Sequence, residues 1–162
     1  GLVQVPAALC PRLAWADDGS ALLPSSAARA PEEQKGGTMS KASKTSASET
    51  VEAEGYEGHI ENMGDGYTAA FETYTVETDL APYLKGLPDD RCQCAHWGLV
   101  LKGSVTFKNS SGEETFEAGD AYYVAPGHTP IFHAGAELVM FSPTEELQRT
   151  SEAVGRNMEA AG

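Results

Sequence analysis

The chain has 162 residues, enough for one ordinary domain with a single hydrophobic core. Its formal net charge is −13, so the phosphate backbone of a nucleic acid or an anionic lipid surface would repel it. We therefore expect no nucleic-acid partner and no membrane partner, and no apolar run approaches the roughly 20 residues that a spanning helix needs.

The beginning of the chain is predicted to lack a fold of its own. Residues 19–53 consist mainly of Ala, Ser, Thr, Gly, Lys and Glu, which bury too little apolar surface to offset the entropy lost on ordering. We expect residues 1–55 to form a disordered, low-complexity extension. Met39 is a plausible start of the natural protein, and the sequence leaves open whether residues 1–38 belong to it.

From Tyr56 onward, short segments rich in Val, Tyr, Phe and Thr alternate with turn residues. Between Gly103 and Gly135 a turn recurs about every eight residues, which is typical of antiparallel strands in a sandwich or barrel. We expect these segments to form one domain over residues 56–142. The predicted strands cover residues 57–62, 67–77, 92–102, 104–108, 113–118, 120–125, 130–134 and 136–141.

The last segment has the pattern of a helix. Ser142-Pro143-Thr144-Glu145 matches a capping box, with Pro143 at the first helical position, where its missing N–H costs nothing. Apolar residues then recur at helical spacing on one face: Leu147, Val154 and Met158. We predict one helix over about residues 143–159, so that residues 143–162 pack on the barrel.

Two of these segments resemble the signature motifs of a known superfamily. The segment GDAYYVAPGHTP, from Gly119 to Pro130, resembles the second motif of the cupins, and VLKG followed by SVTF resembles the end of the first. Together with LPDDRCQCAHWG and FSPTEELQRT, they are similar to a group of small single-domain bacterial cupins of no settled function. The resemblance covers about residues 56–162. It implies an all-β fold, an antiparallel cupin β-barrel or jelly roll with one C-terminal α-helix.

The resemblance also implies a range of functions. Many cupins bind one divalent metal in the barrel mouth through His residues and a Glu, and they commonly form homodimers. Enzymes of the class include dioxygenases, isomerases and decarboxylases, whereas other members bind sugars or store nitrogen. In this chain His96 stands where the Glu is usual, and Pro130 stands where the second motif has its His. The usual set of three His and one Glu is therefore not expected here.

A different set of metal ligands is available in the same region. Cys92, Cys94 and His96 alternate along a predicted strand and so share one face, and His128 lies in the Pro-Gly loop that cupins place at the same mouth. Cys92 and His96 can reach one ion only if the strand bends. We predict a metal site of Cys94, His96 and His128, with Cys92 as the fourth ligand. Thiolate ligands favour zinc over magnesium, calcium or manganese, and we expect zinc rather than iron.

Three interpretations stay open. The chain is a protein that binds a divalent metal and a small ligand in the barrel mouth, a metal-free ligand-binding or structural cupin whose thiols are packed core, or a metal-dependent isomerase-like or dioxygenase-like enzyme. An enzyme would need an inward acid or base. Glu72 shares a face with Tyr74 and is a candidate, but the sequence does not fix which way that face points.

The spacing of the cysteines indicates in which cellular compartment the protein resides. The three cysteines are Cys10, Cys92 and Cys94, and two thiols so close on an extended strand are not suited to an ordinary disulfide. The sequence therefore favours a reducing, cytoplasmic location. It assigns no catalytic residue and no organic cofactor, and it leaves the substrate, any reaction and the oligomeric state undetermined beyond the expected homodimer.

Overall fold

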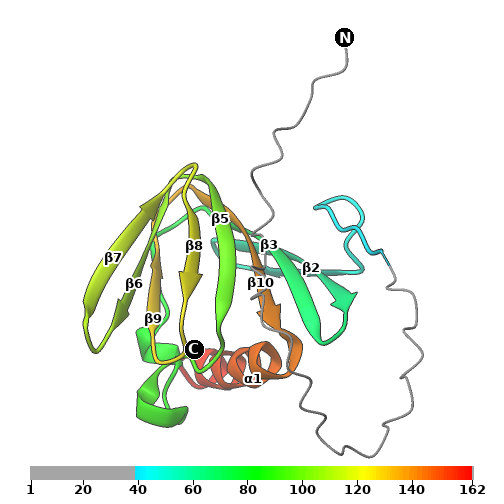
Figure 1. Cartoon of the computed structure of the whole chain (residues 1–162). Helices are drawn as coiled ribbons and strands as arrows, with labels where there is room; N and C mark the ends of the chain where they lie inside the picture. The colour runs from blue at the N-terminus through cyan, green and yellow to red at the C-terminus, as the bar shows by residue number, and fades with distance from the viewer. Residues whose placement is uncertain (1–38, 162) are drawn as a thin grey trace, which may run out of the picture. The chain divides into compact units, whose positions relative to one another are not determined.

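The computed structural model describes residues 39–161, so the expectations for residues 1–38 lie outside the described residues. Ten strands in this range form two antiparallel sheets that face each other (Figure 1). The six-stranded sheet has the order β1-β2-β3-β10-β5-β8, and the four-stranded sheet has the order β4-β9-β6-β7. The predicted all-β fold with one C-terminal helix is confirmed.

The bounds of the elements follow the predicted segments in most places. The strands are β1 (Glu49–Ala53), β2 (Tyr56–Gly64), β3 (Tyr67–Tyr74), β4 (Thr78–Asp79), β5 (His96–Lys102), β6 (Ser104–Asn109), β7 (Gly112–Glu117), β8 (Ala121–Val124), β9 (Thr129–Phe132) and β10 (Ala136–Pro143). The helices are the short 3-10 helices η1 (Ala81–Tyr83) and η2 (Pro88–Asp90) and the helix α1 (Thr144–Ala161).

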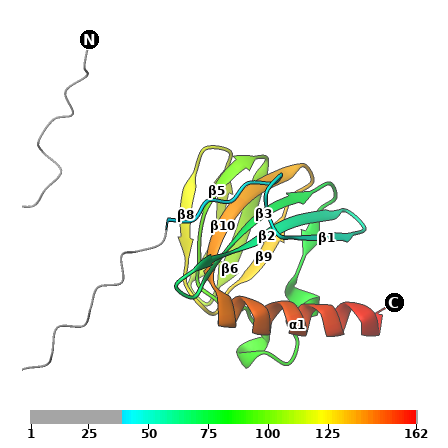
Figure 2. The ribbon, with the colours of Figure 1, turned by 90° about the vertical axis from the view of Figure 1, so that its right-hand side faces the viewer.

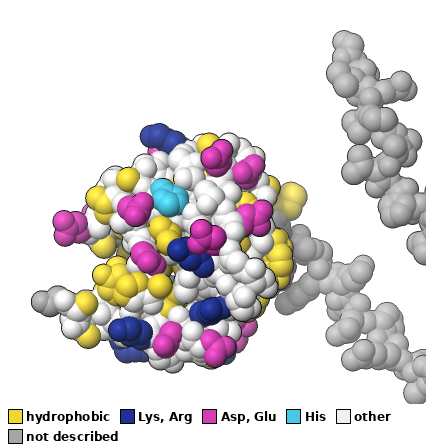
Figure 3. Space-filling model, turned by 90° about the vertical axis from the view of Figure 1, so that its left-hand side faces the viewer, with side chains coloured by type: hydrophobic (Ala, Val, Ile, Leu, Met, Phe, Trp, Pro, Cys, Tyr) yellow, Lys and Arg dark blue, Asp and Glu magenta, His cyan; other side chains and the backbone are white. Residues whose placement is uncertain are grey.

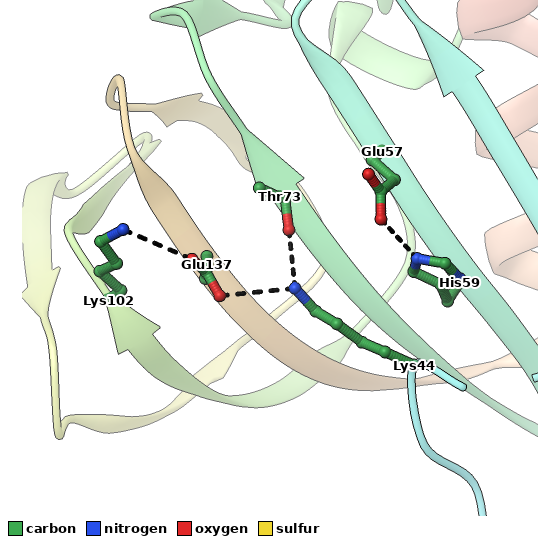
Figure 4. A network of polar contacts seen from close by, with 6 residues as sticks. All are labelled: Lys44, Glu57, His59, Thr73, Lys102 and Glu137. Carbon is green, nitrogen blue, oxygen red and sulfur yellow. Dashed lines mark hydrogen bonds and ion pairs between the residues drawn. The ribbon is translucent and has the colours of Figure 1, made fainter. Parts of the chain in front are cut away.

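The structure differs from the prediction at the start of the domain. Residues 49–53, expected within the disordered extension, form β1 and pair with β2 in a regular antiparallel register. All five side chains of β1 are exposed, so β1 is held by its backbone hydrogen bonds to β2. A strand of this kind has no alternation of apolar residues that the sequence could show. Upstream of β1, the Lys44 ammonium donates to the Thr73 hydroxyl at 2.9 Å and pairs with Glu137 (Figure 4).

A second difference lies before β5. The strand predicted over residues 92–102 begins only at His96, and upstream of it Asp89 and Asp90 adopt positive φ angles of 55° and 52°. Cys92 instead forms an isolated bridge with His128. Its N–H donates to the His128 carbonyl at 2.9 Å, and its own carbonyl accepts from Gly127 N–H at 2.7 Å. This bridge ties the two signature segments together.

The core lies between the two sheets. Tyr74 of β3 stacks on Phe132 of β9, with ring centroids 4.0 Å apart and planes 3° from parallel. Burial of such aromatic and aliphatic groups is the main force holding the sheets together. The buried apolar residues of this cluster are Ala70, Tyr74, Val100, Val105, Phe107, Tyr122, Val124, Phe132, Ala136, Leu138 and Met140.

The helix α1 crosses below the two sheets (Figure 2). Pro143, predicted to open the helix, is the last residue of β10, and the helix begins at Thr144. Ala153 is its buried residue, and Leu147 and Val154 pack on a small cluster that contains Leu84. The Asn157 amide also donates to the carbonyls of Tyr83 and Lys85. The helix therefore closes one end of the space between the sheets.

The surface on the side of β6 and β7 carries acidic, basic and hydrophobic side chains interspersed with one another (Figure 3). Within residues 39–161, no helix is both long enough and apolar enough to cross a bilayer.

Candidate metal centre and cavity

Three buried side chains from separate segments converge at the end of the sandwich that faces α1. Cys92 lies before β5, His96 opens β5, and His128 lies just before β9. One ligand atom from each lies within 4.8 Å of the other two, and the three side chains are 3%, 6% and 1% exposed. The Cys92 Sγ is 3.5 Å from the Nε2 of His96. Zn–S and Zn–N bonds of about 2.3 and 2.0 Å at a tetrahedral angle place two ligand atoms about 3.5 Å apart, so this pair fits one zinc ion.

Both imidazoles are held by a hydrogen bond on the nitrogen away from the cluster. The Nδ1 of His128 donates to the Ala125 carbonyl at 2.7 Å, which fixes the tautomer and leaves the Nε2 lone pair free. The Nδ1 of His96 lies 2.7 Å from the Ser142 hydroxyl. Hydrogen bonds of this kind orient histidine ligands in metal sites. The group therefore combines potential ligand atoms with hydrogen bonds that fix the two imidazole rings.

The electrostatics favour the neutral imidazoles that bind metals. Burial lowers the pKa of His96 to about 3, and the neighbouring His128 adds to this effect. Burial also lowers the pKa of His128, although its bond to Ala125 opposes the shift. Burial raises the pKa of the Cys92 thiol, so the thiol is protonated unless a cation is present. A bound metal would displace that proton.

Cys94, which the sequence favoured as a ligand over Cys92, lies outside this group. Its Sγ approaches the carbonyl oxygens of Ala95 at 3.4 Å and Pro143 at 3.8 Å, and the residue is fully buried. The prediction assumed that side chains alternate along an extended strand through residue 92. Because the chain bends before His96, Cys92 and not Cys94 comes next to the imidazoles.

A cavity of about 680 Å³ adjoins the cluster, and Cys92, His96 and His128 are part of its wall. Apolar side chains from both sheets and from α1 supply much of the rest, among them Ile60, Phe132, Met140, Leu147 and Val154. No Lys or Arg side chain within residues 39–161 lines it, whereas three carboxylates do: Glu49, Glu54 and Glu72. Such a concave, mostly apolar space with a few convergent polar groups is typical of a small-molecule site.

Glu72 points into the cavity, which settles the facing that the sequence left open. It is 6% exposed, and its Oε1 accepts a hydrogen bond from the Tyr56 hydroxyl at 2.9 Å. Burial raises its pKa to about 7, against the opposing effect of bonds from Tyr56 and Tyr74. In the sheet, Thr68 pairs with Ser142 near the imidazoles, and Glu72 lies four residues further along β3. At about 3.3 Å per residue this is about 13 Å, so the carboxyl and the Cys/His cluster lie in separate parts of the cavity.

Comparison with known proteins gives structural matches only. No family model and no curated protein matches the chain. It is similar to a protein of unknown function from Rhizobium leguminosarum, with 16% identity over 65% of this chain and 95% of that one and a TM-score of 0.49. It is also similar to an RmlC-like cupin from Shewanella frigidimarina, with 17% identity over 59% of this chain and 83% of that one and a TM-score of 0.42. A third match is the oxalate decarboxylase of Lactobacillus farciminis, with 16% identity over 66% of this chain and 34% of that one and a TM-score of 0.48.

At these identities and TM-scores, the names of the matches assign no activity to this chain. The fold itself is clear from the chain's own geometry. Two facing antiparallel sheets carry the two signature segments on β5, β8 and β9, and the bridge between Cys92 and His128 joins them at one end. The protein is therefore a cupin-fold jelly roll.

Proposed function

We propose that this protein binds one zinc ion through Cys92, His96 and His128, together with a small molecule in the adjoining cavity. The observation that carries the proposal is the pair of outer hydrogen bonds. His96 is held by Ser142 and His128 by Ala125, so both rings are fixed beside the Cys92 thiol. Two histidines that served only as core packing would not need this arrangement, in which Nδ1 of each ring is hydrogen-bonded and Nε2 of His96 lies 3.5 Å from a thiol.

The donor set suits zinc. One thiolate and two imidazoles are ligands that favour zinc over the hard cations, and three protein ligands leave a fourth position for an exogenous oxygen. When bound, such an ion supplies a Lewis acid or an anchor for that oxygen. The protein's own part is to hold the three ligands and to present the apolar cavity next to them.

A metal-dependent enzyme, isomerase-like or dioxygenase-like, is the second candidate. The observation that favours it is Glu72, a buried carboxyl in the same cavity with a pKa raised to about 7 by burial, in the range of a general acid or base. Its distance of about 13 Å along the strand from the cluster means that only an elongated substrate would reach both. We therefore place binding first.

We also propose a homodimer formed by the outer face of the six-stranded sheet. Phe141, Trp97 and Tyr123 are register neighbours on β10, β5 and β8 and are 41%, 42% and 55% exposed. An exposed aromatic row of this kind is uncommon on a monomer. At its edge, Lys102 pairs with Glu137, so the rim carries both charges and can complement a second copy related by two-fold symmetry.

The metal proposal is tested by elemental analysis of the full chain after zinc loading and gel filtration. We expect about one zinc per chain in the parent, strong loss in Cys92→Ser and His128→Ala, and retention in Cys94→Ser. Cys94 is the matched control because it is an equally buried thiol two residues away. A folded parent without zinc, or equal retention in Cys92→Ser, would show that the cluster is packed core.

A further inference from the structure

The buried carboxyl of Glu72 lines the cavity and has one oxygen without a partner. Glu72 is 6% exposed, and its Oε1 accepts a hydrogen bond from the Tyr56 hydroxyl at 2.9 Å. Its Oε2 has no hydrogen-bond partner among residues 39–161. Because buried polar atoms are nearly always paired, this oxygen is the position at which a ligand in the cavity would place a donor.

The strand register places Tyr56 and Glu72 together on the inner face of the six-stranded sheet. Glu72 pairs with Gly58 of β2, and Tyr56 precedes Gly58 by two residues and so shares its face. The Tyr56 phenol lies over Gly58, because a Cβ built on Gly58 would collide with the Tyr56 hydroxyl. The glycine therefore leaves the space through which the phenol reaches the carboxyl on β3, and Oε1 uses the single hydrogen of that hydroxyl.

The surroundings of Oε2 offer hydrogen-bond acceptors and no free donor. The hydrogen of Tyr56 is already bonded, and the hydroxyl of Tyr74 also acts on the Glu72 carboxyl. The positions that share the row of Glu72 across the sheet carry no polar side chain: Val51 on β1, Gly58 on β2 and Leu138 on β10. A hydroxyl bound here would leave its own lone pairs without a donor, whereas an ammonium group has donors only. This arrangement favours an ammonium over a hydroxyl.

The charges and the aromatic rings of the cavity also favour a cation. Glu49 and Glu54 line the cavity together with Glu72, and no Lys or Arg within residues 39–161 does, so a positive charge is attracted and a negative charge is repelled. Tyr56 and Tyr74 are register partners that line the same space, with ring centroids 5.1 Å apart. Aromatic rings attract an ammonium group through their faces.

We propose that the cavity binds an organic ammonium compound with a mostly apolar body, whose ammonium group donates to Oε2 of Glu72. The apolar body packs against Ile60, Phe107 and Phe132, which line the same space. This inference rests on the ligand-binding half of the proposed function and names its ligand class. It does not rest on the metal, because the carboxyl lies about 13 Å along the sheet from the Cys/His cluster.

The test uses the full chain, both stripped with a chelator and loaded with zinc. Two probes that differ in one group, 4-methylbenzylammonium and 4-methylbenzyl alcohol, are titrated by calorimetry at pH 8. We expect the ammonium to bind about tenfold more tightly in both forms, since a hydrogen bond between two charged groups is about twice as strong as a neutral one. Glu72→Gln should remove this preference. The matched control Glu57→Gln removes a carboxylate beside His59 on the outer face of the same sheet and should keep the preference (Figure 4).

A second measurement avoids any change to the core. The pKa of Glu72 is about 7, and the protonated carboxyl cannot pair with an ammonium. In the unaltered protein the affinity for the ammonium should therefore fall about tenfold from pH 8 to pH 6, while the affinity for the alcohol stays the same. Tyr56 and Tyr74 keep their protons in this range, because burial raises their pKa values. Glu49→Gln should show the same pH dependence as the parent.

The outcomes separate this inference from the rest of the proposed function. If both probes bind with equal affinity at pH 8, the cavity is a ligand site and the ammonium inference is overturned. If neither probe binds at millimolar concentrations, both the inference and the ligand-binding proposal are overturned. An ammonium preference in protein that takes up no zinc would uphold this inference while the metal proposal fails.

Discussion

The Nδ1 of His96 lies 2.7 Å from the hydroxyl of Ser142, and both side chains are buried between β5 and β10. This bond holds the ring so that Nε2 faces the Cys92 thiol. Ser142→Ala should therefore lower the zinc affinity by about 10- to 100-fold without abolishing binding, as loss of outer hydrogen bonds does in other metal sites. Competition with a fluorescent chelator measures this. Ser151→Ala, at an exposed serine of the cavity wall, is the control, and equal affinities in the two variants would contradict the role of Ser142.

Gly98 gives a prediction about stability. A Cβ there would lie 2.4 Å from the Tyr122 ring and 2.7 Å from the Val139 carbonyl, so Gly98→Ala must displace the ring or the backbone. We expect a loss of about 1–3 kcal/mol in the free energy of unfolding, measured by denaturant titration. Gly155→Ala in α1 meets no atom within 4 Å and should instead stabilise the helix by up to about 1 kcal/mol. The close packing of Tyr122 would be refuted by a neutral Gly98→Ala.

Glu72 should make the stability fall as the pH rises. Its pKa of about 7 in the folded protein exceeds the ordinary value of 4.5, so the folded state holds the proton more tightly than the unfolded chain does. Its contribution is complete below pH 4.5 and is lost by pH 7, about 3 kcal/mol in all. Denaturant titrations of metal-free protein across this range should show the slope, and Glu72→Gln should remove it. If the free energies of unfolding of the parent and of Glu72→Gln changed with pH in the same way, the raised pKa of Glu72 would be contradicted.

His96 should have the opposite dependence. Burial lowers its pKa from 6.5 to about 3, so its contribution is complete above pH 6.5 and is lost as the pH falls toward 3. The expected loss is about 5 kcal/mol in metal-free protein. Because Glu72 acts in the other direction between pH 4.5 and 6.5, the effect is measured as the difference between the parent and His96→Gln at each pH. A difference that does not change with pH would contradict a buried neutral imidazole.

The aromatic row on the outer face gives a prediction about self-association. Trp97→Asp places a charge beside Tyr123, whose ring centroid lies 5.0 Å from that of Trp97. If two copies meet there, sedimentation velocity should show a dimer for the parent and a monomer for the variant, since burying an unpaired charge in an interface is costly. Val76→Asp changes an exposed apolar residue that follows β3 and should remain dimeric. A monomeric parent would refute the proposal.

The parts of the fold that could be predicted are those with strong local signals. The turn spacing between Gly103 and Gly135 located β6 to β10, and the spacing of apolar residues located α1. The strand β1 was missed because its five exposed side chains carry no apolar pattern. The place of Cys92 was predicted less well than that of His128, because Cys92 forms an isolated bridge before β5 and does not continue that strand, which residue spacing does not reveal. The facing of Glu72 needed the pairing of β3 with β10.

In the hairpin of β1 and β2, the residues that line the cavity begin earlier in the sequence than the residues that form the core. No side chain of β1 is buried, yet Glu49, Val51 and Ala53 line the cavity. A fragment beginning at Tyr56 would thus keep the hydrophobic core but lose one wall of the cavity. Such a shortened chain should still melt cooperatively. The residues that form the core and the residues that enclose the cavity therefore begin at different points of the sequence.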